Sequence, residues 1–499
     1  IGNKTATICS GDTFTVTPSN GVGSDIVPSG TTYIWTVANA VNVTGEANQT
    51  TAQSSISQAL INTTNTVQTV IYTVTPTSGD SGTCLGTTFT VTVTVNPKPV
   101  IGDKTATICS GDTFIVPLTN NAPAQIVPTN TTYTWTVVDN VNVNGDVAES
   151  TAQNSISQTL TNTTNTVQTV VYTVTPVSGT CTGATFTVTV TINPKPVVAN
   201  DVATICSGDT FTVIPTSSTG AGTYTWTVAD NPNITGESNQ TAAQASISQT
   251  LINTSNTVQT VVYTATPTTT SNCIGATFTV TVTVDPKPLI GNKTATICSG
   301  DTFAVTPLNV VGSDIVPANT TYTWTVVSQP NVTGEADELT PQSIISQSLI
   351  NDTNTVQTVV YTVTPTSGVS GNCVGATFTV TVTLNPKPVI ANTTAVICSG
   401  SSFTVTPTNV ANGDIVPSGT TYTWTVIDNP DVSGESNQVT GQASISQILT
   451  NNSNIVQTVV YTVTPKTSLN CTGATFTVTV TVNPKPVISN KTATICSGD

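Results

Sequence analysis

The sequence of 499 residues contains no histidine, no arginine and no methionine, and only 7% of its residues are charged. The absence of histidine excludes Ser-His-Asp and Cys-His catalytic arrangements, and the absence of arginine excludes arginine clamps on a transition state. Zinc binding is also disfavoured, because a Cys-x-x-C pair is missing as well. We therefore expect no enzyme activity, no catalytic residue, no cofactor and no metal ion.

Positive charge is scarce, since 10 lysines stand against 25 acidic residues and the formal net charge is −15. Nucleic-acid binding needs clustered Lys and Arg, so we do not expect it. The sequence has neither an apolar run of roughly 18 residues, as a membrane span requires, nor an N-terminal signal segment. Because the chain begins without methionine and stops inside a repeated motif, we expect it to be an interior part of a longer protein.

The sequence is rich in repeats. The motif Lys-Thr-Ala-Thr-Ile-Cys-Ser-Gly-Asp occurs at residues 4–12, 104–112, 293–301 and 491–499. The cysteine of this motif and its variants recurs every 92 to 100 residues, at Cys9, Cys109, Cys206, Cys298, Cys398 and Cys496. Such a period indicates an array of similar domains. We predict five repeats and the start of a sixth, at residues 1–97, 98–194, 195–286, 287–386, 387–484 and 485–499.

Threonine alternates with apolar residues in long segments of every repeat. In the fourth repeat, residues 376–384 place Phe378, Val380 and Val382 on one face and threonines on the other, which is the pattern of a half-buried strand. Similar segments lie at residues 302–307, 320–326 and 356–365. With three shorter segments this predicts about seven strands per repeat and no long helix. The fold class is therefore all-β, a tandem array of immunoglobulin-like β-sandwich domains.

Each repeat has one tryptophan, in a Tyr-x-Trp strand between its two cysteines. A recurring inward position normally belongs to packing, so we expect these residues to anchor the cores: Trp35, Trp135, Trp226, Trp324 and Trp424. The alternative is a sugar-stacking platform, which would require the rings to face solvent.

Proline-containing linkers separate the repeats, as Asn-Pro-Lys-Pro at residues 96–99, 193–196, 385–388 and 483–486 and as Asp-Pro-Lys-Pro at 285–288. Two prolines in four residues favour a short, semi-rigid connection. We therefore expect an elongated rod. Since strands rise about 3.3 Å per residue, we expect each repeat with its linker to be about 40 Å long and the rod of five repeats to be about 200 Å long.

Two cysteines per repeat indicate structural disulfides in an oxidising compartment. Pairing within a repeat is the first expectation, with candidates Cys9 and Cys84, Cys109 and Cys181, Cys206 and Cys273, Cys298 and Cys373, and Cys398 and Cys471. However, the two positions would lie at opposite poles of an ordinary sandwich, and a disulfide tolerates only about 6 Å between Cα atoms. The alternative crosses between neighbours and pairs Cys9 with Cys181, Cys109 with Cys273, Cys206 with Cys373, and Cys298 with Cys471. Both arrangements leave Cys496 with a partner outside this sequence.

Acidic side chains recur in two turns and raise the question of calcium. One turn is Ser-Gly-Asp, with Asp12, Asp112, Asp209 and Asp301, and the other is Gly-Glu, with Glu46, Glu237, Glu335 and Glu435. No dense D-x-D-x-D run accompanies them, so turn formation is the better explanation. Rows of threonine could order water as ice-binding surfaces do, but an uncharged coat on exposed strands is the simpler interpretation.

The repeat resembles a known family. Its order is Ile-Cys-Ser-Gly-Asp-Thr-Phe-Thr-Val, then Tyr-Thr-Trp-Thr-Val, then Val-Tyr-Thr-Val-Thr-Pro, then Cys-x-Gly-Ala-Thr-Phe-Thr-Val-Thr-Val-Thr-Val-Asn-Pro-Lys-Pro. Over essentially the whole chain this order resembles the PKD-like, Ig-like repeats of giant Bacteroidetes surface proteins, especially the mobile adhesins of gliding flavobacteria. The W-x-F-G-D-G signature of true PKD domains is missing, so no calcium role is carried over.

The resemblance implies type 9 secretion, an extracellular location on the cell surface, and outer-membrane anchoring or motility machinery outside this part of the chain. We expect the repeats to form the stalk or filament of an adhesin used in gliding or attachment, with neighbouring repeats as direct partners. The alternative is a carbohydrate-binding array of a secreted enzyme or matrix protein, with surface polysaccharide as partner.

Overall fold

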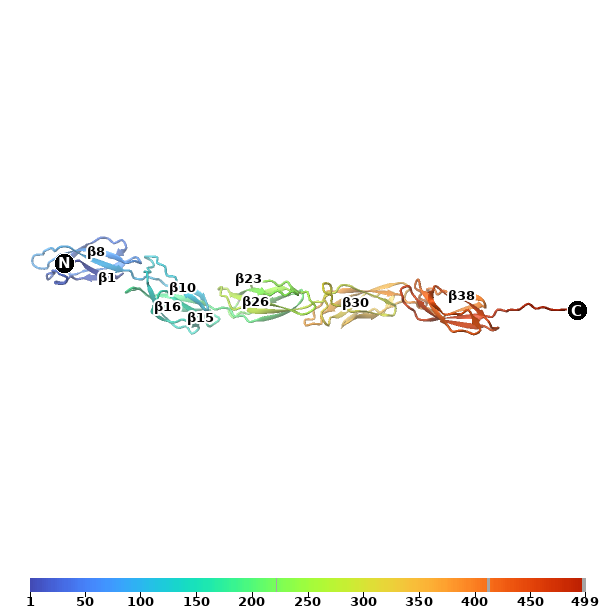
Figure 1. Ribbon diagram of the computed structural model, residues 1–499. Coiled ribbons are helices and arrows are strands. Elements are labelled where there is room, and N and C mark those ends of the chain that lie inside the picture. The colour runs from blue at the N-terminus through green and yellow to red at the C-terminus, as the bar shows by residue number, and fades with distance from the viewer. Residues whose placement is uncertain (221, 411–412, 496–499) are drawn as a thin grey trace.

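The computed structural model describes residues 1–220, 222–410 and 413–495, and all regular elements in these residues are β-strands. The strands form five similar groups in a row, which we call units 1 to 5 (Figure 1). The N-terminus lies in the first unit, and the C-terminal segment extends from the last (Figure 1). The prediction of an all-β tandem array of sandwich domains is thus confirmed.

Unit 1 consists of two facing sheets. The larger has the order β1 (Lys4–Cys9), β9 (Phe89–Asn96), β8 (Gln68–Thr77), β3 (Thr32–Val37), β5 (Gln49–Gln53). The smaller is built from the pairs β2 (Thr13–Val16) with β6 (Ile56–Ala59) and β4 (Val43–Thr44) with β7 (Ile61–Asn62).

The other units repeat this plan with small changes. Unit 2 contains β10 (Lys104–Cys109), β11 (Asp112–Ile115), β12 (Thr132–Val137), β13 (Val143–Asn144), β14 (Glu149–Gln153), β15 (Ser157–Asn162), β16 (Gln168–Ser178), β17 (Cys181–Thr182) and β18 (Phe186–Asn193). Unit 3 contains β19 (Asp201–Cys206), β20 (Thr210–Val213), β21 (Gly222–Val228), β22 (Ile234–Thr235), β23 (Gln240–Gln244), β24 (Ile247–Thr250), β25 (Ile252–Asn253), β26 (Gln259–Thr269) and β27 (Phe278–Asp285).

Unit 4 contains β28 (Lys293–Cys298), β29 (Thr302–Val305), β30 (Thr321–Val326), β31 (Val332–Thr333), β32 (Glu338–Gln342), β33 (Ile345–Ser348), β34 (Ile350–Asn351), β35 (Gln357–Thr366) and β36 (Phe378–Asn385). Unit 5 contains β37 (Thr393–Cys398), β38 (Ser401–Val405), β39 (Thr421–Val426), β40 (Val432–Ser433), β41 (Gln438–Gln442), β42 (Ile445–Asn451), β43 (Gln457–Lys466) and β44 (Phe476–Asn483).

The first and last strands of each unit run side by side in the same direction. In unit 1, β1 pairs with β9 in parallel, from Lys4 beside Val91 to Cys9 beside Asn96. The same parallel ladder joins β10 to β18, β19 to β27, β28 to β36 and β37 to β44. The chain therefore enters each unit at one pole and leaves it at the other, which explains the linear arrangement.

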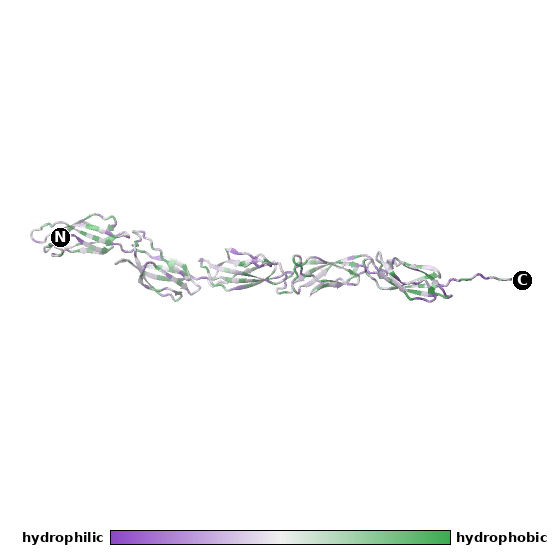
Figure 2. Ribbon diagram, viewed as in Figure 1, coloured by the Kyte–Doolittle hydropathy of each residue, from purple (hydrophilic) through white to green (hydrophobic). Residues whose placement is uncertain are grey.

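The core of each unit lies between its two sheets, where the alternating apolar residues meet. In unit 1, Val91, Val93 and Val95 of β9 are fully buried, and Tyr72 of β8 is buried beside Phe14 of β2, with ring centroids 5.2 Å apart. Burial of each such side chain contributes about 1.5–3 kcal/mol. Figure 2 shows the hydrophobic residues gathered in the strands of each unit.

Each unit has one edge strand that lies outside the seven expected segments. These strands, β5, β14, β23, β32 and β41, pair with the tryptophan strands β3, β12, β21, β30 and β39. Their sequences, such as Gln-Thr-Thr-Ala-Gln at Gln49–Gln53, point mainly to solvent and lack alternation, so periodicity gives no sign of them. In addition, one expected segment is divided into two strands in units 1, 3 and 4 (β6 and β7, β24 and β25, β33 and β34), and unit 2 has the short strand β17.

Candidate functional site at the joints between units

The two cysteines of one unit lie at opposite poles. In unit 2, Cys109 ends β10 beside Asn193, where the chain leaves the unit. Cys181 lies opposite Ser178 in the hairpin that joins β16 to β18, at the pole where the chain enters. The eight residues of β18 separate the two poles, a rise of about 25 Å. A bond between these two cysteines is therefore excluded by distance.

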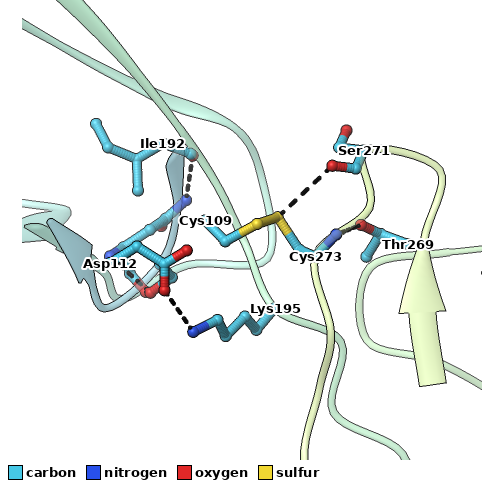
Figure 3. The surroundings of a disulfide bond; sticks show 9 residues. Cys109, Asp112, Ile192, Lys195, Thr269, Ser271 and Cys273 are labelled. Atoms are coloured by element: carbon cyan, nitrogen blue, oxygen red, sulfur yellow. Dashed lines mark hydrogen bonds and ion pairs between the residues drawn. A yellow bond between two sulfur atoms is a disulfide. The ribbon is translucent and has the colours of Figure 1, made fainter. Parts of the chain in front are cut away.

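Four disulfides occur in the described part of the chain, and each joins neighbouring units. The pairs are Cys9–Cys181, Cys109–Cys273, Cys206–Cys373 and Cys298–Cys471, with Cα–Cα distances of 5.5, 5.5, 5.7 and 5.7 Å. Figure 3 shows the second of them, at the joint between units 2 and 3. Pairing within a repeat, the first expectation from the sequence, is therefore wrong, and the crossed arrangement is present.

Two cysteines at the outer ends of this pattern have no partner among the described residues. They are Cys84, in the hairpin of unit 1, and Cys398, at the end of β37 in unit 5, and both are exposed. The equivalent hairpin cysteines that pair across a joint are buried: Cys181, Cys273, Cys373 and Cys471. Formation of a joint thus covers the hairpin sulfur. Cys496 lies outside the described residues.

A glycine two residues after the hairpin cysteine allows the linker to pass close by. A Cβ atom added to Gly183 would lie 2.4 Å from the carbonyl oxygen of Pro99, the last proline of the preceding linker. The same close approach occurs between Gly275 and Pro196, Gly375 and Pro288, and Gly473 and Pro388. These glycines were not among the residues expected from the sequence, although the Cys-x-Gly spacing recurs in it.

The linkers pack against the units that follow them. Val100 forms a bridge with Ile126 in the loop before β12, with backbone N–O distances of 2.9 and 2.8 Å in the two directions. Equivalent bridges join Val198 to Ser217, Leu289 to Ile315 and Val389 to Ile415. We call the loops that receive the linker, before β12, β21, β30 and β39, the landing loops. Each of the four linkers between units is thus fixed by its prolines, a disulfide and a landing loop.

An acidic residue anchors the landing loop to the first strand. In unit 4, Asp314 accepts hydrogen bonds from the backbone N–H of Gly291 at 2.9 Å and from Nζ of Lys293 at 2.5 Å. The Gly291 N–H and the Lys293 ammonium together hold the pKa of Asp314 below its ordinary value. In unit 1, Asp25 binds Lys4 and Gly2 in the same way, and its pKa is also lowered.

Two aspartates of the Ser-Gly-Asp turns contact lysines of the linkers. Lys195 lies 3.0 Å from Asp112, as Figure 3 shows beside the disulfide, and Lys387 lies 3.8 Å from Asp301. Both pairs are about half exposed, so each contributes less than about 1 kcal/mol. From the sequence these aspartates were expected only to form the turn, and their contact with the linker was not foreseen.

The joint between units 3 and 4 has an aspartate where the other linkers have asparagine. Asp285 is fully buried, and its Oδ1 accepts a hydrogen bond of 2.9 Å from Oγ of Ser370 in the next unit. This contact adds a direct side-chain link between the two units.

The glutamates of the Gly-Glu turns stabilise loops. Glu46, Glu237, Glu335 and Glu435 each accept a backbone N–H six residues earlier, at 2.9 to 3.2 Å. These carboxylates lie near buried tyrosines, whose pKa values are raised by burial and then by the carboxylate, as for Tyr72 and Tyr263. Within the described ranges, no three His, Cys, Asp or Glu side chains are grouped so that they could hold a metal ion.

The five tryptophans lie in the cores with 3 to 5% of their surface exposed. Four of them donate Nε1–H to a backbone carbonyl of the loop before the edge strand, as Trp35 does to Ala47 at 3.2 Å. In this position their ring faces are covered, whereas a sugar platform would need them open.

The profile of the PKD-like domain family matches residues 6–99, 106–196, 203–288, 295–388 and 395–486, one match for each unit. The chain belongs to the PKD-like domain family. None of the curated proteins compared with it is similar enough to count as a relative. Among the described PKD-like domains, no helix is long and apolar enough to span a membrane.

Solved structures similar to these PKD-like domains include other tandem arrays. The extracellular domain of protocadherin GammaB4 is 12% identical, with a TM-score of 0.19, and the match covers 97% of this chain and 84% of that one. Sidekick-1 immunoglobulin domains 1–5 are 10% identical, with a TM-score of 0.20 and coverage of 97% and 98%. Mouse cadherin-23 EC22–24 is 12% identical, with a TM-score of 0.20 and coverage of 57% and 96%. At these TM-scores the likeness carries no argument about function.

Proposed function

We propose that these PKD-like domains form part of the stalk of a secreted cell-surface adhesin, which holds a distal binding tip away from the cell and transmits force. In this proposal the stalk serves gliding motility or surface attachment, and the tip and the anchoring machinery belong to segments outside the 499 residues. The array itself has no catalytic role.

The observation that supports the proposal best is the doubled connection at each of the four joints. A proline-containing linker and a disulfide join every unit to the next, and a landing-loop bridge fixes the linker at each of these joints. We expect such joints to resist bending and rotation, which is what a stalk requires. A flexible chain of binding modules would not need them.

The four disulfides also support an extracellular location, because disulfides persist in oxidising compartments. Export by type 9 secretion and placement on the surface of a gliding bacterium follow from the resemblance of the repeats. They are part of the proposal.

A carbohydrate-binding array is the second candidate. Its support in the sequence was the repeated Tyr-x-Trp strand, but the rings of that strand are buried in all five units. We therefore favour the stalk.

Small-angle scattering and electron microscopy of the oxidised chain test the proposed shape. The expected result is a stiff rod of about 200 Å for five units of about 40 Å each, calculated from strand lengths. Reduction of the disulfides under otherwise identical conditions provides the control and should increase bending at the joints. A compact particle in the oxidised sample would contradict the proposal.

A further inference from the structure

We infer that the crossed disulfides connect the strands into two continuous covalent threads, and that these threads spread a pulling force over the ladders of all five units at once. The biological use of this device rests on the proposed stalk function. The device itself depends only on the connectivity of the disulfides and strands.

The first thread follows one strand from each unit. It begins with β1, crosses the Cys9–Cys181 disulfide to β18, and continues through the linker to β19. It then crosses Cys206–Cys373 to β36 and continues through the next linker to β37, which ends at Cys398.

The second thread uses the other strand of every ladder. It begins with β9, passes through the linker to β10, and crosses the Cys109–Cys273 disulfide to β27. From β28 it crosses Cys298–Cys471 to β44, the last strand of unit 5.

The threads contain little slack. Between disulfides, the first thread uses residues 181–206, which comprise β17, β18, a linker and β19 and span two successive units. About 25 residues at 3.3 Å each cover about 80 Å in strand geometry. The same residues reach about 90 Å at most when fully extended. Pulling therefore cannot lengthen a thread appreciably.

The ladders connect the two threads in every unit. Each parallel ladder pairs one strand of the first thread with one of the second, namely β1 with β9, β10 with β18, β19 with β27, β28 with β36, and β37 with β44. A pull on the N-terminus acts on β1, in the first thread, and a pull on the C-terminal segment acts on β44, in the second. The load must therefore pass from one thread to the other through the ladders.

This arrangement changes how the units fail. Without disulfides, the same force passes through the five ladders in series, and the weakest unit shears and unfolds first. With inextensible threads, no ladder can slide unless the others slide too, so the ladders share the force. Unfolding of a single unit would then not lengthen the rod.

Single-molecule pulling between the two ends of the full chain tests the inference. The force–extension curve of the oxidised chain should contain no steps from single units and should end in one rupture at high force. After reduction, the same chain should show successive steps of about 300 Å, the length that roughly 95 residues release when they become fully extended.

Two matched variants keep the test valid if the fully reduced chain does not fold. Cys206→Ser with Cys373→Ser cuts the first thread, and Cys109→Ser with Cys273→Ser cuts the second, and each variant retains three disulfides. Both should rupture at lower force than the oxidised parent, because fewer ladders share the load. Five successive unit steps in the oxidised parent, or unchanged rupture forces in both variants, would overturn the inference. The rod shape seen by scattering would stand in either case.

Discussion

Cys109 and Cys273 are bonded although they lie 164 positions apart and belong to neighbouring units. The parallel ladder of β10 and β18 carries Cys109 to the exit pole of unit 2, where it meets the entry hairpin of unit 3. Each joint is therefore closed twice, by the peptide chain and by a disulfide.

The double closure predicts that a joint survives cleavage of its linker. A protease site placed in residues 194–196 should give, after cutting, one band of full size on a non-reducing gel and two fragments on a reducing gel. Only the Cys109–Cys273 disulfide connects the fragments on either side of this cut.

The two double variants serve as matched controls for this cleavage. Cys109→Ser with Cys273→Ser should separate into two fragments without reductant. Cys206→Ser with Cys373→Ser should stay together, because its missing disulfide lies wholly within the C-terminal fragment. Separation of both variants would contradict the assigned joint.

Gly183 should tolerate no larger side chain. Gly183→Val places a Cβ 2.4 Å from the Pro99 carbonyl oxygen, and backbone must move to relieve it. Overpacking of this kind costs about 1–3 kcal/mol, so the joint between units 1 and 2 should loosen and unit 2 should melt earlier. Gly102→Ala is the control, since nothing lies within 4 Å of its added Cβ. If calorimetry gives the same melting temperature of unit 2 for the two variants, this role of Gly183 is refuted.

The landing loop of unit 4 should make the thermal stability of this unit depend on pH. The pKa of Asp314 is lowered in the folded state from its ordinary value of 3.8, chiefly by the Gly291 N–H and then by Lys293. Because the pKa of this carboxyl is lower in the folded than in the unfolded state, its ionised form stabilises the folded state at pH values above 3.8. This stabilisation is lost as the pH falls through the folded-state pKa. Asp314→Asn should thus melt earlier than the parent at pH 7, with a difference that shrinks toward pH 2. A difference that stays constant with pH would argue against the ionised contact.

The buried tryptophans predict the fluorescence of the array. Emission from Trp35 and its equivalents should be blue-shifted, because 95% or more of each residue is covered. Added polysaccharides should leave the spectrum unchanged, with the unfolded chain in denaturant as the exposed reference. Saturable quenching by a polysaccharide would instead support the carbohydrate-binding alternative.

Much of the fold could be predicted from the alternation of threonine with apolar residues. That pattern identifies strands such as Phe378–Asn385, since one face packs in a core and the other faces solvent. The edge strands could not be found, because a strand such as Gln49–Gln53 has no buried face to leave a pattern. Such a segment becomes a strand because it pairs with the neighbouring strand of the sheet, and its own sequence carries no pattern that predicts this.

The sequence narrowed the disulfides to two arrangements but could not choose between them. The choice depends on the parallel pairing of β10 with β18, which sets the pole that Cys109 occupies, and spacing along the chain does not reveal it. The close approach of Gly183 to Pro99 is equally a contact between units. Such contacts arise only when the folded units are placed next to one another.

Peptide mapping of the oxidised chain without reductant determines whether the disulfides cross the joints. We expect disulfide-linked peptides that contain Cys109 with Cys273 and Cys206 with Cys373, so that every bond crosses a joint. Recovery of Cys109 with Cys181, two cysteines of a single unit, would contradict the crossed joints and the covalent threads built from them.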